Sequence, residues 1–313
     1  MNFVARTPNV TSMNSASAAD SDRMSALVCM RDVQSVEPLA GGITNRNYRV
    51  TTKSAEFVVR VSDPESSVLA IDRHHEYENT ARAAQAGAGP AVVEYLEGAG
   101  LLVVEWIDGV TFHPQDVANP ANLPRVAAAC RRLHSGPAFV SSFNMFDIQQ
   151  RYLRLVLEQG FRLPDAYLEF SEHVDRIRHA FAVRPEPLVP CNNDTLAENF
   201  VDDFDRVWII DYEYSGNNEA SFELGNIWSE STLDDELLDL LVEAYWGTPD
   251  PSKIARARLW GLMSKYGWTL WASIQDAISP IEFDYWGWGM EKYERAVAEF
   301  RSPHFNRLLE QAT

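Results

Sequence analysis

The chain divides into a β-rich first third and a mainly helical remainder, and this division limits the folds that it can adopt. Short runs of β-branched residues separated by turn residues, the first turn at Gly41-Gly42, are typical of an antiparallel sheet. A stretch of helix-forming residues interrupts them and stops at Gly87. We therefore predict a helix at 71–86 inserted in a five-stranded sheet, with strands at 35–39, 47–52, 56–61, 91–95 and 101–106.

Helical patterns dominate after Asp108-Gly109. Asn122 is suited to cap a helix that ends near His134. Thr232 with Asp235 resembles a capping box that opens a helix over 233–246, and a further helix is predicted over 253–278. The patterns predict an α+β fold with two lobes: a small antiparallel β-rich N-lobe with one inserted helix (27–107) and a larger, mainly helical C-lobe (108–313). Residues 1–26, rich in Ser, Ala, Asn and Asp, are predicted to be a disordered arm.

Charge and composition exclude several classes of function. The 313 residues carry a formal net charge of −18, which repels a phosphate backbone, so we expect no nucleic-acid partner and favour a cationic one. No apolar run approaches the roughly 18 residues that a membrane span needs, and no signal peptide is evident, so we expect a cytoplasmic protein without membrane insertion. The three cysteines lack paired metal-ligand spacing, and this predicts neither disulfides nor a zinc site.

Three oxygen-bearing side chains in the segment 191–211 have a spacing that suits phosphoryl transfer. Asp194 and Asn199 lie five residues apart, and Asp211 follows the apolar run 207–210. Phosphoryl transfer needs a carboxylate for the attacking hydroxyl, and an amide oxygen and a second carboxylate suit Mg²⁺. Taken alone, the Asp194/Asn199 pair is typical of an ordinary polar turn. The pair alone does not distinguish a phosphoryl-transfer site from a turn, and other segments of the sequence are needed.

Four blocks of sequence occur together in this chain: GGITNRNY (41–48), the segment 191–211, YEYSGNNEASFELGNIWSE (212–230) and WTLWASIQDAISPIEFDYWGWGMEKYERA (268–296). With them the chain resembles the choline/ethanolamine kinase family, within the wider group of aminoglycoside-phosphotransferase-like kinases, over about residues 35–300. The resemblance implies a protein-kinase-like fold that uses ATP and Mg²⁺. It implies Asp194 as the catalytic carboxylate and Asn199 and Asp211 as the metal ligands. Asn192 stands where relatives often have His, and we expect it to support the loop by hydrogen bonds.

The resemblance also implies that the N-lobe binds the nucleotide. The segment with Gly42, Thr44 and Asn45 resembles the turn that covers the phosphates. Arg60 is expected to contact the α/β-phosphates, with Glu76, or Glu78 as an alternative, as its partner on the inserted helix. The segment with Glu105 and Ile107 resembles the strand whose backbone reads adenine.

A substrate pocket is implied in the C-lobe. Trp268 and Trp271 lie off the apolar stripe of their predicted helix, which is either ordinary packing or, by resemblance, part of a cage for an ammonium group. The aromatic cage, as we use the name below, comprises Trp268, Trp271, Tyr285 and Trp288. Glu230 and Glu213 are the expected acidic neighbours. Glu223 and Asn226 are expected to brace the catalytic loop, and the histidines to be ordinary surface or core residues.

The sequence thus predicts a kinase that phosphorylates the hydroxyl of a small cationic amino alcohol, choline first and ethanolamine second. An antibiotic or amino-sugar phosphotransferase on the same fold, and a non-catalytic binder of quaternary amines, stay open as alternatives. As partners we expect the nucleotide and the amino alcohol, and we also consider a homodimer.

Overall fold

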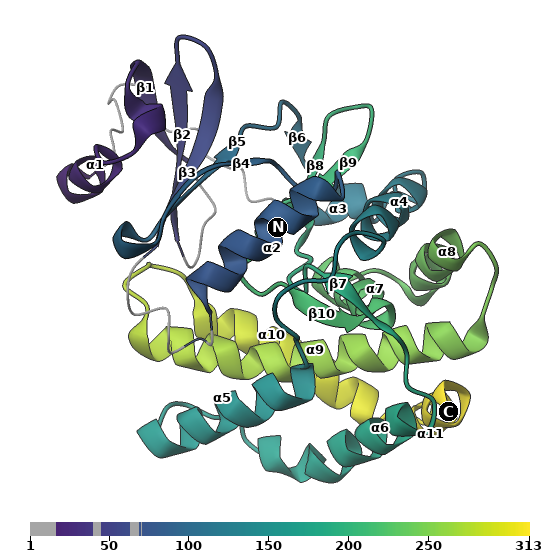
Figure 1. Ribbon diagram of the computed structural model, residues 1–313. Coiled ribbons are helices and arrows are strands. Elements are labelled where there is room, and N and C mark those ends of the chain that lie inside the picture. Colours follow the sequence, from purple (N-terminus) through teal and green to yellow (C-terminus); the bar gives the residue numbers. More distant parts are fainter. Residues whose placement is uncertain (1–16, 40–44, 63–68, 70) are drawn as a thin grey trace, which may run out of the picture. The chain divides into compact units, whose positions relative to one another are not determined.

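The structure, a computed structural model, describes residues 17–39, 45–62, 69 and 71–313. Its contacts divide the chain into two compact units (Figure 1). Unit 1 comprises residues 1–62 and 93–106, and unit 2 comprises residues 63–92 and 107–313. Each unit has its own core, and we describe them in turn. No helix in the described part of the chain is both long and apolar enough to cross a membrane.

Unit 1 is built on the predicted five-stranded sheet, whose strand order is β1-β2-β3-β5-β4. β1, β2, β3 and β5 pair antiparallel, with Val50 opposite Phe57 and Val59 opposite Val103. Their inward side chains form a core that includes Val50, Val59 and Leu101. The strands are β1 (Val33–Leu39), β2 (Arg46–Thr52), β3 (Glu56–Val61), β4 (Val92–Leu96) and β5 (Leu101–Glu105). They confirm the five predicted strands, while the predicted Gly41-Gly42 turn lies outside the described residues.

The predicted disordered arm is wrong for its last part, because residues from Ser17 onward are ordered against the sheet. Helix α1 (Ala18–Met24) begins at Ser17, whose side chain accepts a hydrogen bond from the Asp20 backbone N–H. The buried Asp20 carboxylate accepts hydrogen bonds from Arg46 and from the Tyr48 hydroxyl. Met24 packs into the core of the sheet. The polar composition of this segment therefore gave no indication of the helix, which is held against the sheet by the buried carboxylate of Asp20 and by Met24.

Unit 2 is mainly helical. Its first helix, α2 (Arg73–Gln85), is the predicted inserted helix, but its contacts group it with unit 2, whereas the sequence placed it in the N-lobe. Asn79 shows why, since its side-chain amide donates to the Ser215 carbonyl and its oxygen accepts from the Val140 backbone. The later helices are α3 (Pro114–Val117), α4 (Leu123–His134), α5 (Met145–Gln159), α6 (Ser171–Val183), α7 (Ala220–Glu230), α8 (Asp235–Trp246), α9 (Pro251–Ile278), α10 (Tyr285–Phe300) and α11 (Phe305–Ala312).

Two helix starts differ from the predicted caps. Asn122 precedes α4 but makes no side-chain cap, since its backbone is already helical (φ −88°, ψ −23°), and its amide nitrogen donates to the Asp116 carbonyl. Thr232 has a left-handed backbone (φ 50°) and lies outside α8, which begins after Asp234. The predicted end of α8 is confirmed at Gly247, whose left-handed conformation (φ 82°) suits glycine.

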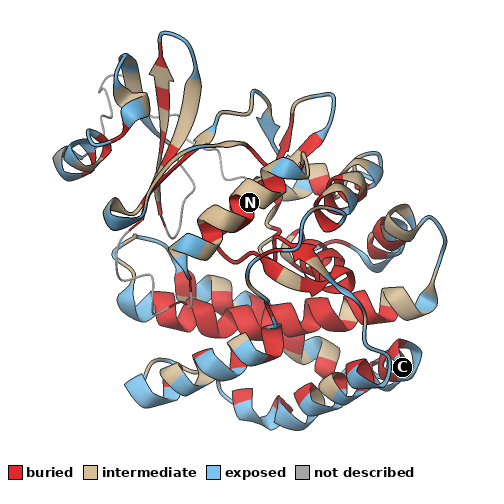
Figure 2. Ribbon diagram, in the orientation of Figure 1, coloured by how far each residue is buried: buried red, intermediate tan, exposed pale blue. Residues whose placement is uncertain are grey.

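Helix α9 lies at the centre of unit 2 and is buried on all sides over most of its length (Figure 2). It packs against α5, α7, α10 and α11. The tightest packing is with α7, where a Cβ at Gly225 would lie 2.0 Å from the Ala257 carbonyl oxygen and one at Gly261 would lie 2.6 Å from the Gly225 carbonyl oxygen. Two glycines therefore let the two helices meet backbone to backbone.

Short strands in unit 2 carry the segment 188–219. β7 (Leu188–Cys191) pairs antiparallel with β10 (Gly216–Glu219), and the hairpin of β8 (Phe200–Asp202) and β9 (Val207–Ile209) is joined by β6 (Val110–Thr111). The loop between β7 and β8 thus begins and ends on paired strands, which fixes both of its ends.

Candidate active site

The β8–β9 hairpin brings together the ends of the predicted catalytic segment. Phe200 pairs with Ile209, so Asn199, just before β8, and Asp211, just after β9, leave the same end of the hairpin. The Ile210 backbone N–H donates to the Asn199 carbonyl at 2.9 Å. The Asn199 side-chain amide nitrogen in turn donates to the Asp194 carbonyl at 2.7 Å, which leaves its amide oxygen for a cation. Antiparallel pairing thus gathers residues that are 17 positions apart in the sequence (194 to 211).

Asn192 connects the loop between β7 and β8 to the segment that follows β9. Its side-chain amide donates to the carbonyls of Ile210 (3.1 Å) and Asp211 (2.7 Å), and its oxygen accepts from the Asp194 backbone N–H (3.1 Å). The residue is fully buried. These bonds agree with the predicted supporting role, and they couple the position of Asp194 to that of Asp211.

Helix α7 holds the loop between β7 and β8 through the side chains of Glu223 and Asn226, as predicted. The two carboxylate oxygens of Glu223 accept the backbone N–H groups of Asn192 and Asn193, each at 2.9 Å. The Asn226 oxygen accepts both the backbone N–H (2.8 Å) and the hydroxyl (2.6 Å) of Thr195. Asn193 adopts a left-handed backbone (φ 67°), a conformation that Asn tolerates better than most residues. The loop is therefore fixed by hydrogen bonds on both sides of Asp194.

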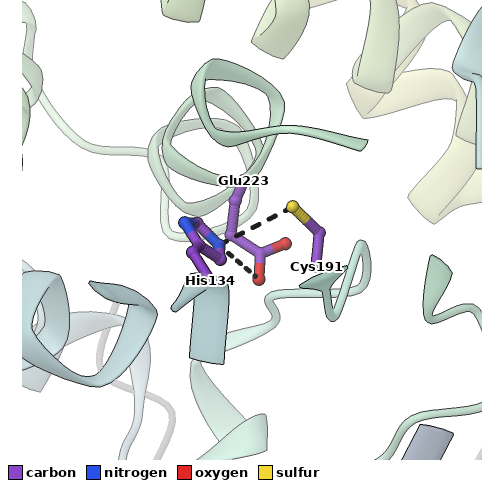
Figure 3. A group of neighbouring side chains, drawn as sticks. All are labelled: His134, Cys191 and Glu223. Atoms are coloured by element: carbon purple, nitrogen blue, oxygen red, sulfur yellow. Dashed lines mark hydrogen bonds and ion pairs between the residues drawn. The ribbon is translucent and has the colours of Figure 1, made fainter. Parts of the chain in front are cut away.

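A group of ligand-type side chains lies behind the loop and was not predicted. His134 from the end of α4, Cys191 from the end of β7 and Glu223 from α7 point toward one another (Figure 3). The His134 Nε2 lies 3.6 Å from the Cys191 Sγ and 3.7 Å from the nearer Glu223 oxygen, and its Nδ1 lies 2.7 Å from the Tyr245 hydroxyl. Burial, with the nearby Glu223 charge, raises the pKa of the Cys191 thiol well above its usual value. The cluster anchors Glu223, the carboxylate that holds the loop.

Asp194 lies in strongly acidic surroundings. Burial raises its pKa well above the usual value, the charges of Asp211, Glu213 and Glu230 raise it further, and Lys292 opposes them. Like charges close together disfavour ionisation, so this arrangement is suited to a group that gains a cation or a proton. The oxygen ligands present, Asn199 and Asp211, are of the type that Mg²⁺ prefers.

Arg73 on α2 links two of the predicted acidic residues. Its Nη1 donates to Glu76 at 2.7 Å and to Glu213 at 3.1 Å, and both carboxylates are almost fully buried. The sequence had placed Glu76 beside Arg60 and Glu213 beside a substrate. The structure adds a bridging arginine that connects α2 to the segment after Asp211.

The four residues of the aromatic cage lie on α9 and α10. Trp271 contacts Tyr285 and Trp288, with ring centroids at 5.8 and 5.5 Å. The ring of Trp268 lies 5.1 Å from that of Tyr214, and the Tyr214 hydroxyl accepts the indole N–H of Trp271 at 2.8 Å. Trp268, Trp271 and Tyr285 are buried, whereas Trp288 is half-buried. Tyr214 thus joins the two tryptophans.

Glu230, at the end of α7, pairs with a cation of the protein itself. Its Oε2 lies 2.5 Å from the Lys292 Nζ, and both side chains are almost fully buried. The same Nζ lies 4.1 Å from the centre of the Trp288 ring. The expected acidic neighbour of the ammonium pocket therefore already has a lysine beside it.

The predicted nucleotide contacts fall mostly in unit 1. Arg60 lies on β3 opposite Asn47 and Leu102. Asn45 is buried and accepts a hydrogen bond from the Ser62 hydroxyl at 3.0 Å. Glu105 is exposed at the end of β5, and Ile107 is the first residue of unit 2 after that strand. Gly42 and Thr44 lie outside the described residues.

Sequence reasoning missed Arg73, Tyr214 and Lys292. Each acts through a contact with a residue at least 57 positions away, and local spacing carries no signal for such contacts. Lys292 did have a weak signal, because it follows Trp288 by four positions on a helix and therefore shares its face.

Comparison with known proteins places this arrangement in a family. The sequence profile of the choline/ethanolamine kinase family matches residues 36–240. The chain is 28% identical to the protein LicA of Haemophilus influenzae over 212 residues, which are 66% of this chain and 61% of that protein. It is 27% identical to a probable ethanolamine kinase of Arabidopsis thaliana over 295 residues, which are 83% of this chain and 78% of that protein. The LicA match thus spans less than two thirds of that relative.

Solved structures agree with the fold. A choline/ethanolamine kinase family protein from Mesorhizobium loti superposes with a TM-score of 0.82 at 29% identity, over 94% of this chain and 98% of that one. An aminoglycoside 2'-phosphotransferase matches with a TM-score of 0.67 at 14% identity, over 93% and 99% of the two chains. The fold is α+β and protein-kinase-like, as predicted.

A sheet-based first unit, a mainly helical second unit and a loop that presents Asp194, Asn199 and Asp211 together define the class of kinase-like phosphotransferases. Within this class, the profile that matches residues 36–240 is that of the choline/ethanolamine kinases. The chain belongs to the choline/ethanolamine kinase family, as the resemblance predicted.

Proposed function

We propose that this protein transfers the γ-phosphoryl group of ATP to the hydroxyl of a small amino alcohol of the choline/ethanolamine type. The observation that carries the proposal is the gathering of Asp194, Asn199 and Asp211 at one end of the β8–β9 hairpin, in a chain whose sequence matches this family. Phosphoryl transfer depends mainly on positioning and charge neutralisation, and a loop fixed on both sides supplies the positioning.

Each residue of the loop has a distinct task in this proposal. Asp194 accepts a hydrogen bond from the substrate hydroxyl and aligns it for attack, and its raised pKa suits a group that takes up that proton. Asn199 and Asp211 would hold Mg²⁺, which neutralises phosphate charge when bound. Without such a cation, the carboxylates around Asp194 would repel the nucleotide. A cytoplasmic location and a homodimer stay predictions.

The aromatic residues support an amine as the acceptor. Buried π-faces of Trp268, Trp271 and Tyr285 attract a cation, by up to about 2 kcal/mol for a desolvated contact. An aminoglycoside carries several amines and hydroxyls and is better served by a broad acidic surface than by closely packed rings. The aminoglycoside phosphotransferase neighbours share the fold at 14–15% identity, so they add no weight to that alternative.

The direct test is coupled detection of ADP with ethanolamine and choline as acceptors. Asp194→Asn is expected to lower kcat at least a hundredfold while ATP binding, measured by calorimetry, changes little, because the phosphates are held by other groups. Asp205→Asn is the matched control, since Asp205 is an exposed carboxylate in the turn of the same hairpin. Turnover by Asp194→Asn at the rate of the control would contradict the role of Asp194, and ATP binding without turnover of any amine would favour a non-catalytic binder.

The metal ligands have their own measurement. Asn199→Ala and Asp211→Asn should each raise the Mg²⁺ concentration needed for half-maximal rate, because each removes or weakens an oxygen ligand. Unchanged Mg²⁺ titrations in both variants would show that the ligands lie elsewhere.

A further inference from the structure

Lys292 places an ammonium group of the protein inside the proposed amine site. Its side chain is 6% exposed, its Nζ is 2.5 Å from Glu230 Oε2, and it lies over the face of Trp288. Trp288 and Lys292 are four residues apart on α10 and therefore share one face of that helix. One ring of the aromatic cage and one carboxylate oxygen are thus already engaged by a cation.

Glu230 keeps one oxygen for another donor. Among the described residues its Oε1 is buried without a hydrogen-bond partner. Glu219, another buried carboxylate, differs in this respect, because Arg256 and Trp260 together occupy both of its oxygens. A buried acceptor left alone destabilises the folded protein, so a ligand N–H that reached Oε1 would recover this loss.

Choline and ethanolamine differ in what they can offer to this oxygen. A trimethylammonium group has no N–H and is held by aromatic faces, and one of those faces carries Lys292. A primary ammonium group has three N–H donors and can use Oε1 directly. The pair also lies close enough to the reaction centre for its charges to act on Asp194.

We propose that Lys292, through Glu230 and Trp288, makes the site selective for an ammonium group that carries N–H donors over a quaternary one. The inference rests on the proposed function and specifies its substrate class. Lys292 is a specificity-determining residue: it covers the Trp288 face and orients Glu230 so that Oε1 is the acceptor.

The test is a series of acceptors in which methyl groups replace N–H donors one at a time: ethanolamine, N-methylethanolamine, N,N-dimethylethanolamine and choline. For the native protein, kcat/KM is expected to fall along the series, by at least tenfold from first to last. In Lys292→Met, which frees the Trp288 face and removes a like charge, the ratio of ethanolamine to choline is expected to fall at least tenfold.

The chain offers a matched control. Lys265 also lies over a tryptophan, Trp228, at 3.8 Å, and pairs with a carboxylate, Glu299, whose Oε2 is buried without a hydrogen-bond partner in the part of the chain that the structure describes. Lys265→Met should affect stability but leave the ratio of ethanolamine to choline unchanged. A change of the ratio as large as that in Lys292→Met would show a general packing effect and overturn the proposal.

A second variant covers the case in which Lys292→Met does not fold. Lys292→Arg keeps the charge, and its guanidinium can bind both oxygens of Glu230, so it should lower kcat/KM for ethanolamine more than for choline. A flat series, a series that favours choline, or an unchanged ratio in the folded Lys292 variants would overturn this inference alone. No turnover of any of the four alcohols would overturn the proposed function and this inference with it.

Discussion

Asn192 shows how one buried side chain can determine the geometry of a catalytic loop. Its amide spans the backbone at Ile210, Asp211 and Asp194, so it fixes the distance between the candidate base and a candidate metal ligand. Asn192→Ala leaves buried carbonyls without a donor, at a cost of about 1–3 kcal/mol. We expect kcat to fall at least tenfold in this variant, with a smaller change in the KM for the amino alcohol.

Asn192→His distinguishes support from direct chemistry. Histidine restores a donor at this position, and the variant is expected to keep kcat within about tenfold of the native value, or about 1.4 kcal/mol. Circular dichroism and steady-state kinetics on both variants give the comparison. If Asn192→Ala were as active as the native protein, the three bonds would have no part in positioning Asp194.

Lys265 predicts a pH dependence of stability. Burial lowers its pKa to about 8, although Glu299 acts in the opposite direction. Below pH 8 the lysine is charged in the folded and the unfolded chain, and the cost of burying the charge is fully present. Between pH 8 and its usual pKa of about 10.4 the unfolded chain binds more protons, so the free energy of unfolding gains a contribution that rises with pH.

The measurement compares the native protein with the double variant Lys265→Met/Glu299→Gln by urea unfolding at pH 7.5, 8.5 and 9.5. Between pH 8 and about 10.4, the free energy of unfolding of the native protein should rise by on the order of 1 to 3 kcal/mol relative to that of the variant. A stability difference that is constant with pH would contradict the lowered pKa of Lys265.

At the scale of single residues, the sequence predicted what lies within one segment and missed what joins segments. Asp194, Asn199 and Asp211 could be singled out because all three lie within one short segment that ends just after the β8–β9 hairpin. Arg73, Tyr214 and Lys292 act across 140, 57 and 62 positions. Their partners are set by the packing of α2, α9 and α10, and no local pattern encodes that packing.

Among the elements, the contact between α7 and α9 leaves almost no room for a larger residue at Gly225. Gly225→Ala would place a Cβ 2.0 Å from the Ala257 carbonyl oxygen, and backbone atoms cannot move aside as a side chain can. Overpacking of this kind costs about 1–3 kcal/mol, and sometimes more. We expect Gly225→Ala to lower the free energy of unfolding, measured with urea, by at least that amount. It should lower kcat as well, because α7 carries Glu223 and Asn226.

Gly98→Ala is the control for this prediction, since its Cβ would meet no atom of the described residues within 4 Å. Equal midpoints for the two alanine variants would show that the helices separate at little cost.

Element prediction succeeded where residues signal locally and failed where burial is decided by neighbours. The strands of unit 1 and the end of α8 at Gly247 follow from β-branched runs and a left-handed glycine. The apolar stripe predicted for α9 did not separate core from pocket, because α5, α7, α10 and α11 surround that helix and bury nearly all of it. Periodicity identifies a buried face only when another face meets water.

For the whole molecule, the net charge of −18 predicts a dependence on salt. A strongly acidic protein attracts a cationic acceptor, and salt screens the attraction over a Debye length of about 10 Å at 0.1 M. The KM for a cationic amino alcohol is therefore expected to rise several-fold between 20 and 500 mM KCl. The binding of 3,3-dimethylbutanol, a neutral isostere of choline, should be insensitive to the same change, and a parallel weakening of both ligands would exclude steering by charge.

Fold class was predictable at this scale because the strand and helix patterns occupy different parts of the chain. The boundaries of the two compact units were harder to predict. Composition suggested disorder for a segment that forms α1, held by Asp20 and Met24. Chain order suggested that α2 belongs with the strands around it, whereas the bonds of Asn79 and Arg73 tie it to unit 2.

The glycine contact between α7 and α9 also has a consequence for how such a protein can diversify. At Gly225 the helix that carries the loop braces meets the backbone of the helix that carries two cage tryptophans, so no side chain can be trimmed or enlarged at that point. Helix α10, which brings Tyr285, Trp288 and Lys292, meets that pair from outside and does not carry the loop. New acceptor preferences can therefore arise by exchange of residues on α10 while the catalytic rate is preserved, and a mutant library confined to that helix is the economical place to search for them.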